Sequence, residues 1–379
     1  MSLTRRGVIA AALAAPAAAA LAKPQLAQAK PYRSMLVIDG LGGISDPYAP
    51  DGELKLSARA IAEMKASGVS AVNATVNAVG NAPSVWTDTL ETIAFYEKVI
   101  AANPGTLMAV RNLADFSLAK AQGKLGIYYG TQDTSLIGTQ LDRLAELKTK
   151  GVRQVQLTYN LRNLSGDGAL EPANAGLSRL GLATIEAIEA QRIVLDLSHG
   201  GARTMAEAAA AAKAPPMISH TGCRALHDHP RNTADETMRA VADKGGCVGI
   251  YFMPFLAPGS KPSGEQLLDH IIHAANVCGE DHVSIGTDGA VLPIVIDDKA
   301  RAAAKADYEA RSKAGFAAPG EGPDVFTVVM DYNSIDKFER LAGALAKRGW
   351  TTRQIEKLLG GNLVRLYAAV WGTEQCKDT

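Results

Sequence analysis

The stretch that decides the fold is IVLDLSH (193–199), followed by a helical run and then by PMISHT (216–221). Both apolar runs are typical of buried strands, and they carry His199 and His220 at their carboxyl ends. The residues between them, TMAEAAAAAKA, are helix formers. The pattern therefore predicts a strand–helix–strand unit with a histidine at the end of each strand. In parallel α/β folds, functional residues gather at those ends.

Similar apolar runs recur along the chain, with helix-like segments between them. The nine predicted strands lie at 35–41, 69–76, 106–112, 125–132, 152–160, 193–199, 216–221, 246–253 and 282–288. Nearly continuous apolar runs are expected of strands that are buried on both faces. We therefore expect one α/β domain over residues 33–375, a (β/α)8 TIM barrel. Since a barrel needs eight strands, we expect 106–112 to be short or to lie outside it.

Capping residues mark the helix boundaries. Thr233 and Glu236 form one predicted capping box, and Thr351 and Gln354 form another, with Gly360 as the expected end of that helix. The alternative fold is an open doubly wound sheet. It would require a glycine-rich phosphate turn after the first strand, and DGLGG (39–43) resembles one only weakly.

The amino-terminal segment 1–29 is typical of a twin-arginine signal peptide. Arg5 and Arg6 precede an Ala-rich apolar run to Ala22, and no acidic residue occurs before Asp39. The alternative is a disordered or anchoring Ala-rich helix. We expect cleavage after Ala22 or Ala29, a periplasmic or secreted protein, and no transmembrane span after removal of the signal.

The composition excludes several classes of protein. Lys+Arg and Asp+Glu both number 39, so the net charge is zero and nothing suggests nucleic-acid binding. The cysteines have no C-x-x-C spacing, which predicts neither a zinc knuckle nor a disulfide framework. They are Cys223, Cys247, Cys278 and Cys376.

The histidine pair predicts a metal site, because imidazoles on neighbouring strands can converge on one zinc ion. Asp288 ends the last predicted strand, where a carboxylate can act as general base; the alternative is an Asx turn or a helix cap. Arg224, four residues after His220, has the planar fork that binds carboxylates; the alternative is an ordinary surface arginine.

At these residues the chain resembles the membrane (renal-type) dipeptidases, peptidase family M19. The matching stretches include VRQVQLTYNLRN (152–163), VLDLSHGGART (194–204), MISHTGCRALHDHPRNTADE (217–236) and HVSIGTDG (282–289). The resemblance implies a metal-dependent hydrolase barrel that cleaves dipeptides at a two-zinc site. It assigns His199 and His220 to the second metal, Arg224 to the substrate carboxylate, and Asp288 to the nucleophilic water and the substrate amine.

The chain departs from the family pattern at the first metal. The family's first strand ends in D-G-H-x-D, whereas this chain has Asp39-Gly40-Leu41-Gly42-Gly43. The bridging glutamate aligns with Gln132, and a substrate-contacting histidine aligns with Tyr159. These departures indicate a divergent bacterial member with a degenerate metal site. We expect one zinc ion at most, held by His199, His220 and Gln132.

Two hypotheses follow. The first is an exported hydrolase of dipeptides or similar small amides, in which Asp288 accepts a proton and Tyr159 polarises the scissile carbonyl. The second is a catalytically inactive barrel that binds small molecules or peptides in the periplasm. The expected partner is a small-molecule or dipeptide substrate, with homodimer formation as an open expectation.

The signal segment gives a direct prediction. Mature protein from the native host should begin near Lys23 or Lys30, and replacing Arg5 and Arg6 with lysine should block export, because twin-arginine transport reads the arginine pair. Amino-terminal sequencing and cell fractionation provide the measurement. Unprocessed protein in the cytoplasm would contradict the prediction.

Overall fold

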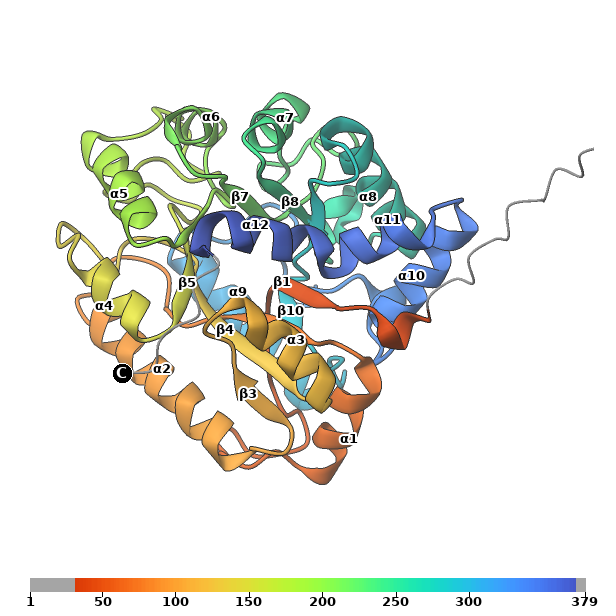
Figure 1. The fold of residues 1–379 in the computed structure, drawn as a ribbon. Coiled ribbons are helices and arrows are strands. Elements are labelled where there is room, and N and C mark those ends of the chain that lie inside the picture. The colour runs from red at the N-terminus through yellow and green to blue at the C-terminus, as the bar shows by residue number, and fades with distance from the viewer. Residues whose placement is uncertain (1–30, 373–379) are drawn as a thin grey trace, which may run out of the picture.

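The computed structural model describes residues 31–372, so the predicted signal at 1–29 and Cys376 lie outside the described residues. A parallel sheet curls into a barrel that is surrounded by helices (Figure 1). The strands are β1 (Ile38–Gly43), β2 (Ala71–Thr75), β3 (Leu107–Ala109), β4 (Leu125–Thr131), β5 (Val152–Gln156), β6 (Val194–Asp196), β7 (Met217–Thr221), β8 (Cys247–Ile250), β9 (Val283–Ile285) and β10 (Gly289–Ala290). The α-helices are α1 (Ala58–Ser67), α2 (Val85–Ala102), α3 (Leu113–Gln122), α4 (Arg143–Thr149), α5 (Arg179–Ala190), α6 (Ala202–Ala211), α7 (Asp235–Asp243), α8 (Gly264–Cys278), α9 (Asp298–Lys313), α10 (Lys337–Lys347), α11 (Thr352–Glu356) and α12 (Asn362–Trp371).

The order of the strands confirms the predicted barrel. The sheet runs β10-β1-β2-β4-β5-β6-β7-β8-β9, and every pairing within it is parallel. β10 follows β9 after a short turn and pairs with β1, which closes the circle. β3 pairs with β4 alone and lies off this path. The segment 106–112 is therefore short and lies outside the closed circle. This confirms the expectation that followed from nine predicted strands in a barrel of eight.

Helix α12 covers the amino-terminal end of the barrel, across which it lies in Figure 1. Its apolar side chains form a separate cluster with the first residues of several strands. That cluster includes Ile38 of β1, Ala71 of β2, Val194 of β6, Met217 of β7, Cys247 of β8, and Leu363, Leu366, Tyr367, Val370 and Trp371 of α12. One end of the barrel is thus sealed by apolar packing, which leaves the carboxyl ends of the strands for a site.

The structure corrects two predicted helix boundaries. Helix α7 has Ala234 at its N-cap with no side-chain cap, because the hydroxyl of Thr233 contacts that of Thr221 at 2.9 Å. The Thr351–Gln354 capping box is present, but the helix does not end at Gly360. The chain continues through a π-turn at Lys357–Gly361 into α12. Glycine is needed at 360 because a Cβ there would lie 2.5 Å from the carbonyl oxygen of Leu36.

No helix within residues 31–372 combines the length and apolarity that a membrane crossing requires.

Glycine at position 249 allows β8 to approach β7 closely beside the predicted histidine. A Cβ at Gly249 would lie 1.9 Å from the carbonyl oxygen of Ser219, the residue before His220. A Cβ at Gly286 would lie 2.1 Å from the same oxygen. Two glycines therefore surround the backbone of Ser219, and any larger side chain would displace this strand.

Substitution of Gly249 by alanine should lower the free energy of unfolding by about 3 kcal/mol or more, because the clash is with backbone atoms. Gly343→Ala is the matched control: this helical glycine of α10 is exposed and has no atom within 4 Å of a Cβ. It should raise stability by about 0.5–1 kcal/mol through helix propensity. Urea unfolding measures both, and a Gly249→Ala protein as stable as the parent would contradict the strand packing.

Candidate active site

The two predicted histidines meet at the open end of the barrel. His199 follows β6 by three residues, and His220 lies in β7. Their ring centroids are 4.8 Å apart, and both side chains are buried. Asp288, which precedes β10, joins them so that one ligand atom from each residue lies within 4.8 Å of the others. The structure therefore brings His199, His220 and Asp288 together at metal-ligand spacing.

His199 is fixed by the residues that follow β5. Its Nδ1 lies 2.6 Å from Oδ1 of Asn160. Since this amide oxygen can only accept, Nδ1 carries the proton and Nε2 keeps its lone pair. The ring of Tyr159 stacks on His199 with centroids 4.0 Å apart. The backbone of His199 is left-handed, with φ of 60°. These contacts leave Nε2 of His199 buried without a hydrogen-bond partner.

His220 is oriented through a serine and a buried carboxylate. Its Nδ1 lies 2.8 Å from Oγ of Ser219, and that hydroxyl donates to Oδ2 of Asp196 at 2.5 Å. Asp196 is fully buried on the neighbouring strand β6. Nε2 of His220, like that of His199, is buried without a hydrogen-bond partner.

The electrostatic surroundings keep both imidazoles neutral. Burial lowers the pKa of His199 well below its usual range, and the positive charge of Arg231 lowers it further. Burial and Arg231 act in the same way on the pKa of His220. Neutral imidazole with a free Nε2 is the form that binds a metal. An unpartnered buried nitrogen is otherwise costly, so this pair fits a metal ion.

Asp288 is held in a strained backbone conformation at the edge of the site. Its φ is 57°, in the left-handed region, and its amide donates to the carbonyl oxygen of Leu41 at 2.9 Å. Desolvation raises the pKa of Asp288 to about 6, against the opposing effect of Arg231 and Arg311. A carboxylate poised near neutral pH can accept a proton from a water molecule.

The guanidinium that faces this cluster belongs to Arg231. Arg231 is 4% exposed, and its Nη2 is buried without a partner. It acts electrostatically on His199, His220 and Asp288. Arg224, the arginine predicted from the sequence, instead lies 3.6 Å from Asp228 and is one-third exposed. The structure thus points to Arg231 as the arginine available to an anionic group in the site.

A segment after β10 covers the same end of the barrel. Arg311 on α9 donates to the hydroxyl of Tyr159 at 3.1 Å and forms a two-bond ion pair with Glu321. Asn160 donates to the carbonyl oxygen of Phe316 at 2.7 Å. Sequence reasoning missed Arg311, which follows no recognisable motif, and Asn160, which lies beside Tyr159 in the stretch 152–163 but has no motif of its own. Only the fold brings Arg311 from an Ala-rich helix to Tyr159.

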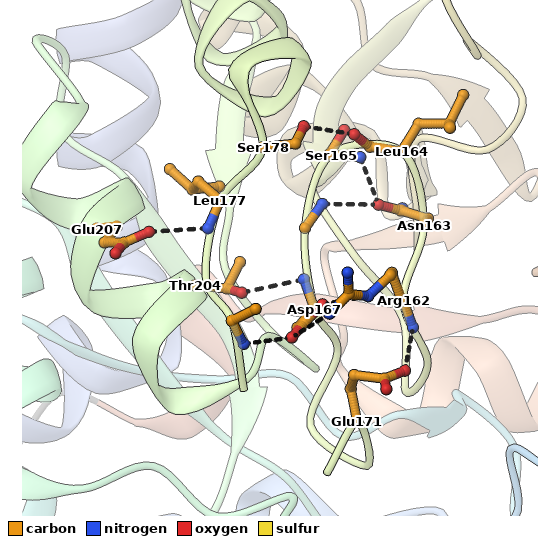
Figure 2. A network of polar contacts seen from close by, with 12 residues as sticks. Arg162, Asn163, Leu164, Ser165, Asp167, Glu171, Leu177, Ser178, Thr204 and Glu207 are labelled. Atoms are coloured by element: carbon orange, nitrogen blue, oxygen red, sulfur yellow. Dashed lines mark hydrogen bonds and ion pairs between the residues drawn. The ribbon is translucent and has the colours of Figure 1, made fainter. Parts of the chain in front are cut away.

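The long β5–α5 loop packs on the turn that carries His199. Figure 2 shows its polar network, in which Asp167 binds Arg162 and contacts Thr204 of α6. The carbonyl oxygen of Asp167 also accepts from Gly201 at 2.9 Å. The amide of Ala169 donates to the carbonyl oxygen of His199 at 2.7 Å. The β5–α5 loop is therefore an ordered support for His199.

Among the described residues, the position that the resemblance assigns to a first metal holds no comparable cluster. Leu41 is buried, and Gly42 and Gly43 pair with Gly289 and Ala290 of β10. Among residues 31–372, His199, His220 and Asp288 are the histidine, cysteine and acidic side chains that converge at metal-ligand spacing. Gln132 donates through Nε2 to Thr75 of β2 at 3.0 Å, so its role as a ligand stays a prediction.

Asp133, next to Gln132, is not among the residues that converge with the histidines. Its carboxylate accepts from the amides of Gly80 and Ser135 and is almost fully buried. This agrees with the alternation of side chains along the strand that precedes it. The bridging carboxylate of a two-metal site is thus not replaced by its neighbour.

A (β/α)8 barrel with two histidines and an aspartate at the carboxyl ends of its strands has the architecture of the metal-dependent hydrolase barrels. The model of the membrane dipeptidase family, peptidase family M19, matches residues 51–300. The chain belongs to this family.

Individual relatives agree with the family assignment. A dipeptidase of Clonostachys rogersoniana is 25% identical over 250 residues, which cover 65% of this chain and 56% of that protein. The chain thus spans little more than half the length of this relative. An amidohydrolase structure from Pseudomonas aeruginosa is 30% identical with a TM-score of 0.76, covering 90% of this chain and 98% of that one. A metallopeptidase structure from Rhodobacter sphaeroides shares the fold, with 18% identity and a TM-score of 0.70. The match covers 89% of this chain and 99% of that one. That structure is liganded with a phosphinate mimic of the dipeptide L-Ala-D-Ala.

Proposed function

We propose that the protein is a hydrolase of dipeptides or similarly small amides that uses one divalent metal ion, zinc. The observation that carries the proposal is the pair of buried, unpartnered Nε2 atoms of His199 and His220 beside Asp288. Two imidazoles and a carboxylate are ligands that zinc prefers. When bound, the ion polarises a carbonyl and acidifies a water molecule.

Three side chains of the site take separate roles in the proposed hydrolysis. Asp288 accepts the proton of the attacking water, since its carboxylate lies beside the two histidines that would hold the ion. Arg231 binds the carboxylate of the substrate with its unpartnered Nη2. Burial raises the pKa of the Tyr159 phenol, so the hydroxyl keeps its proton. That hydroxyl accepts a hydrogen bond from Arg311 and donates its own proton to the substrate carbonyl.

Two of the relatives support small peptides as substrates. One is named a dipeptidase, and the Rhodobacter structure contains a mimic of a dipeptide. The site also suits a dipeptide by its charge, since the unpartnered Nη2 of Arg231 can bind the carboxylate of the substrate. The twin-arginine segment further supports export, so we propose that the substrate is met in the periplasm or outside the cell.

One observation favours a second function, a binding protein without catalysis. At the position that the resemblance assigns to a first metal, β1 pairs closely with β10, and Nη2 of Arg231 is buried without a partner. Such a barrel would bind a small acid or peptide and leave it unchanged. Metal content and hydrolysis, measured together, separate the two functions.

Protein purified without chelator should contain about one zinc ion per chain, because three ligand side chains converge at one position. His199→Ala should remove most of the metal and the dipeptidase activity, since the remaining imidazole and carboxylate bind zinc weakly. Elemental analysis and a dipeptide hydrolysis assay provide the measurements. Two tightly bound ions would contradict the site described above. Absence of metal and of hydrolysis, with small acids still bound, would support the binding protein.

Arg231 and Arg224 provide a matched pair, because both lie between β7 and α7. Arg231→Ala should raise KM for carboxylate-bearing substrates about 10- to 100-fold and leave the metal content unchanged, as expected for lost substrate binding. Arg224→Ala should change KM less than about twofold, since its guanidinium lies beside Asp228. Steady-state kinetics measure both, and the opposite ranking would restore Arg224 as the substrate-binding arginine.

A further inference from the structure

Asp39 on β1 is a buried carboxylate that binds the residue immediately before Asp288. Its Oδ1 accepts from the amide of Thr287 at 2.8 Å, and its Oδ2 accepts from the hydroxyl of Thr287 at 2.6 Å. The hydroxyl of Thr287 in turn accepts from the amide of Gly289 at 3.2 Å. The carboxylate of Asp39 therefore fixes the backbone on both sides of Asp288.

The backbone at Asp288 needs such support. Its φ of 57° is uncommon for a residue other than glycine, and a conformation of this kind persists only where surrounding contacts impose it. β1 supplies the carbonyl oxygen of Leu41, which accepts from the Asp288 amide at 2.9 Å. Phe252, which follows β8, donates its amide to the carbonyl oxygen of Thr287 at 3.1 Å. The turn Thr287–Gly289 is thus held from both neighbouring strands.

The close approach of β1 to this turn requires a glycine at position 42, beside Asp39. A Cβ at Gly42 would lie 2.7 Å from Oδ2 of Asp39 and 2.8 Å from the carbonyl oxygen of Gly289. Glycine at 42 therefore makes room for the contact between Asp39 and Thr287. At the other end of the turn, the ammonium group of the buried Lys337 donates to the carbonyl oxygen of Ala290 at 2.6 Å.

We propose that Asp39 is a positioning residue for hydrolysis, acting through Thr287 to aim the carboxylate of Asp288 at the histidine pair. This inference rests on the proposed function, in which Asp288 accepts a proton. Asp39 and Thr287 touch neither substrate nor metal. Their contribution is the orientation of a strained turn, which should appear in kcat and leave substrate binding by Arg231 unchanged.

The test compares Thr287→Val, which removes the hydroxyl and keeps the shape, with Thr287→Ser, which keeps the hydroxyl. Thr287→Val and Asp39→Ala should lower kcat about 10- to 100-fold with KM within about twofold, because the turn that carries Asp288 loses the buried hydrogen bond that orients it. Thr287→Ser should retain most of kcat. Asp133→Ala is the control: it removes another buried carboxylate bound by backbone amides, and it should leave kcat unchanged.

A second measurement is independent of activity. Hydrogen exchange at the amides of residues 287–289 should become faster in Thr287→Val and Asp39→Ala, and remain unchanged in Asp133→Ala. If Asp39→Ala does not fold, the two Thr287 variants still decide the question. Unchanged kcat in Thr287→Val would overturn the inference.

The two proposals fail in different ways. A parent protein without hydrolase activity contradicts the proposed function. In that case the exchange rates alone test the positioning of the turn. Parent-like protection of residues 287–289 in Thr287→Val would then overturn the role of Asp39, and faster exchange would support it.

Discussion

The histidine pair depends on one buried carboxylate, that of Asp196. Its oxygens accept from the amide and hydroxyl of Ser198, from the amide and hydroxyl of Ser219, and from Nε2 of Gln154. These contacts join β5, β6 and β7 beneath the site. Through Ser219 this carboxylate orients the ring of His220, and through Ser198 it anchors the backbone immediately before His199, whose ring is held by Asn160. Charge-assisted hydrogen bonds in a buried site are strong enough to maintain such an arrangement.

A second buried aspartate, on the opposite side of the barrel, anchors the third converging residue in the same way. Thr287 precedes Asp288 as a serine precedes each histidine, and its hydroxyl binds the buried carboxylate of Asp39. Each of the three converging residues therefore follows a hydroxyl that is anchored to a buried aspartate. The backbones of His199 and Asp288 are both left-handed, a strain of roughly 1–3 kcal/mol each that the anchoring contacts must offset.

The barrel strands and the histidine pair could be predicted because they depend on local pattern. Continuous apolar runs mark strands that are buried on both faces, and a histidine at each strand end follows from the order of the chain. The choice between Arg224 and Arg231 could not be predicted, since both lie in one loop and only tertiary contacts turn Arg231 inward. Arg311 reaches Tyr159 from a distant Ala-rich helix with no motif of its own. The predicted helix N-cap at Thr233 was wrong, because the hydroxyl of Thr233 contacts that of Thr221.

The charges around the site are consistent with the single ion of the proposed function. Arg231 and Arg311 bring two positive charges near the histidines, and Asp288 and Glu321 bring two negative charges. These four groups sum to zero before any metal binds. One divalent ion can be accommodated because the neutral imidazoles and the Asp288 carboxylate offer it ligands at once. A second ion would meet two guanidiniums, and at β1 it would find Leu41 and Gly43 in place of a histidine and an aspartate. The single ion of the proposed function and the burial of Arg231 beside the histidines are therefore electrostatically consistent with each other.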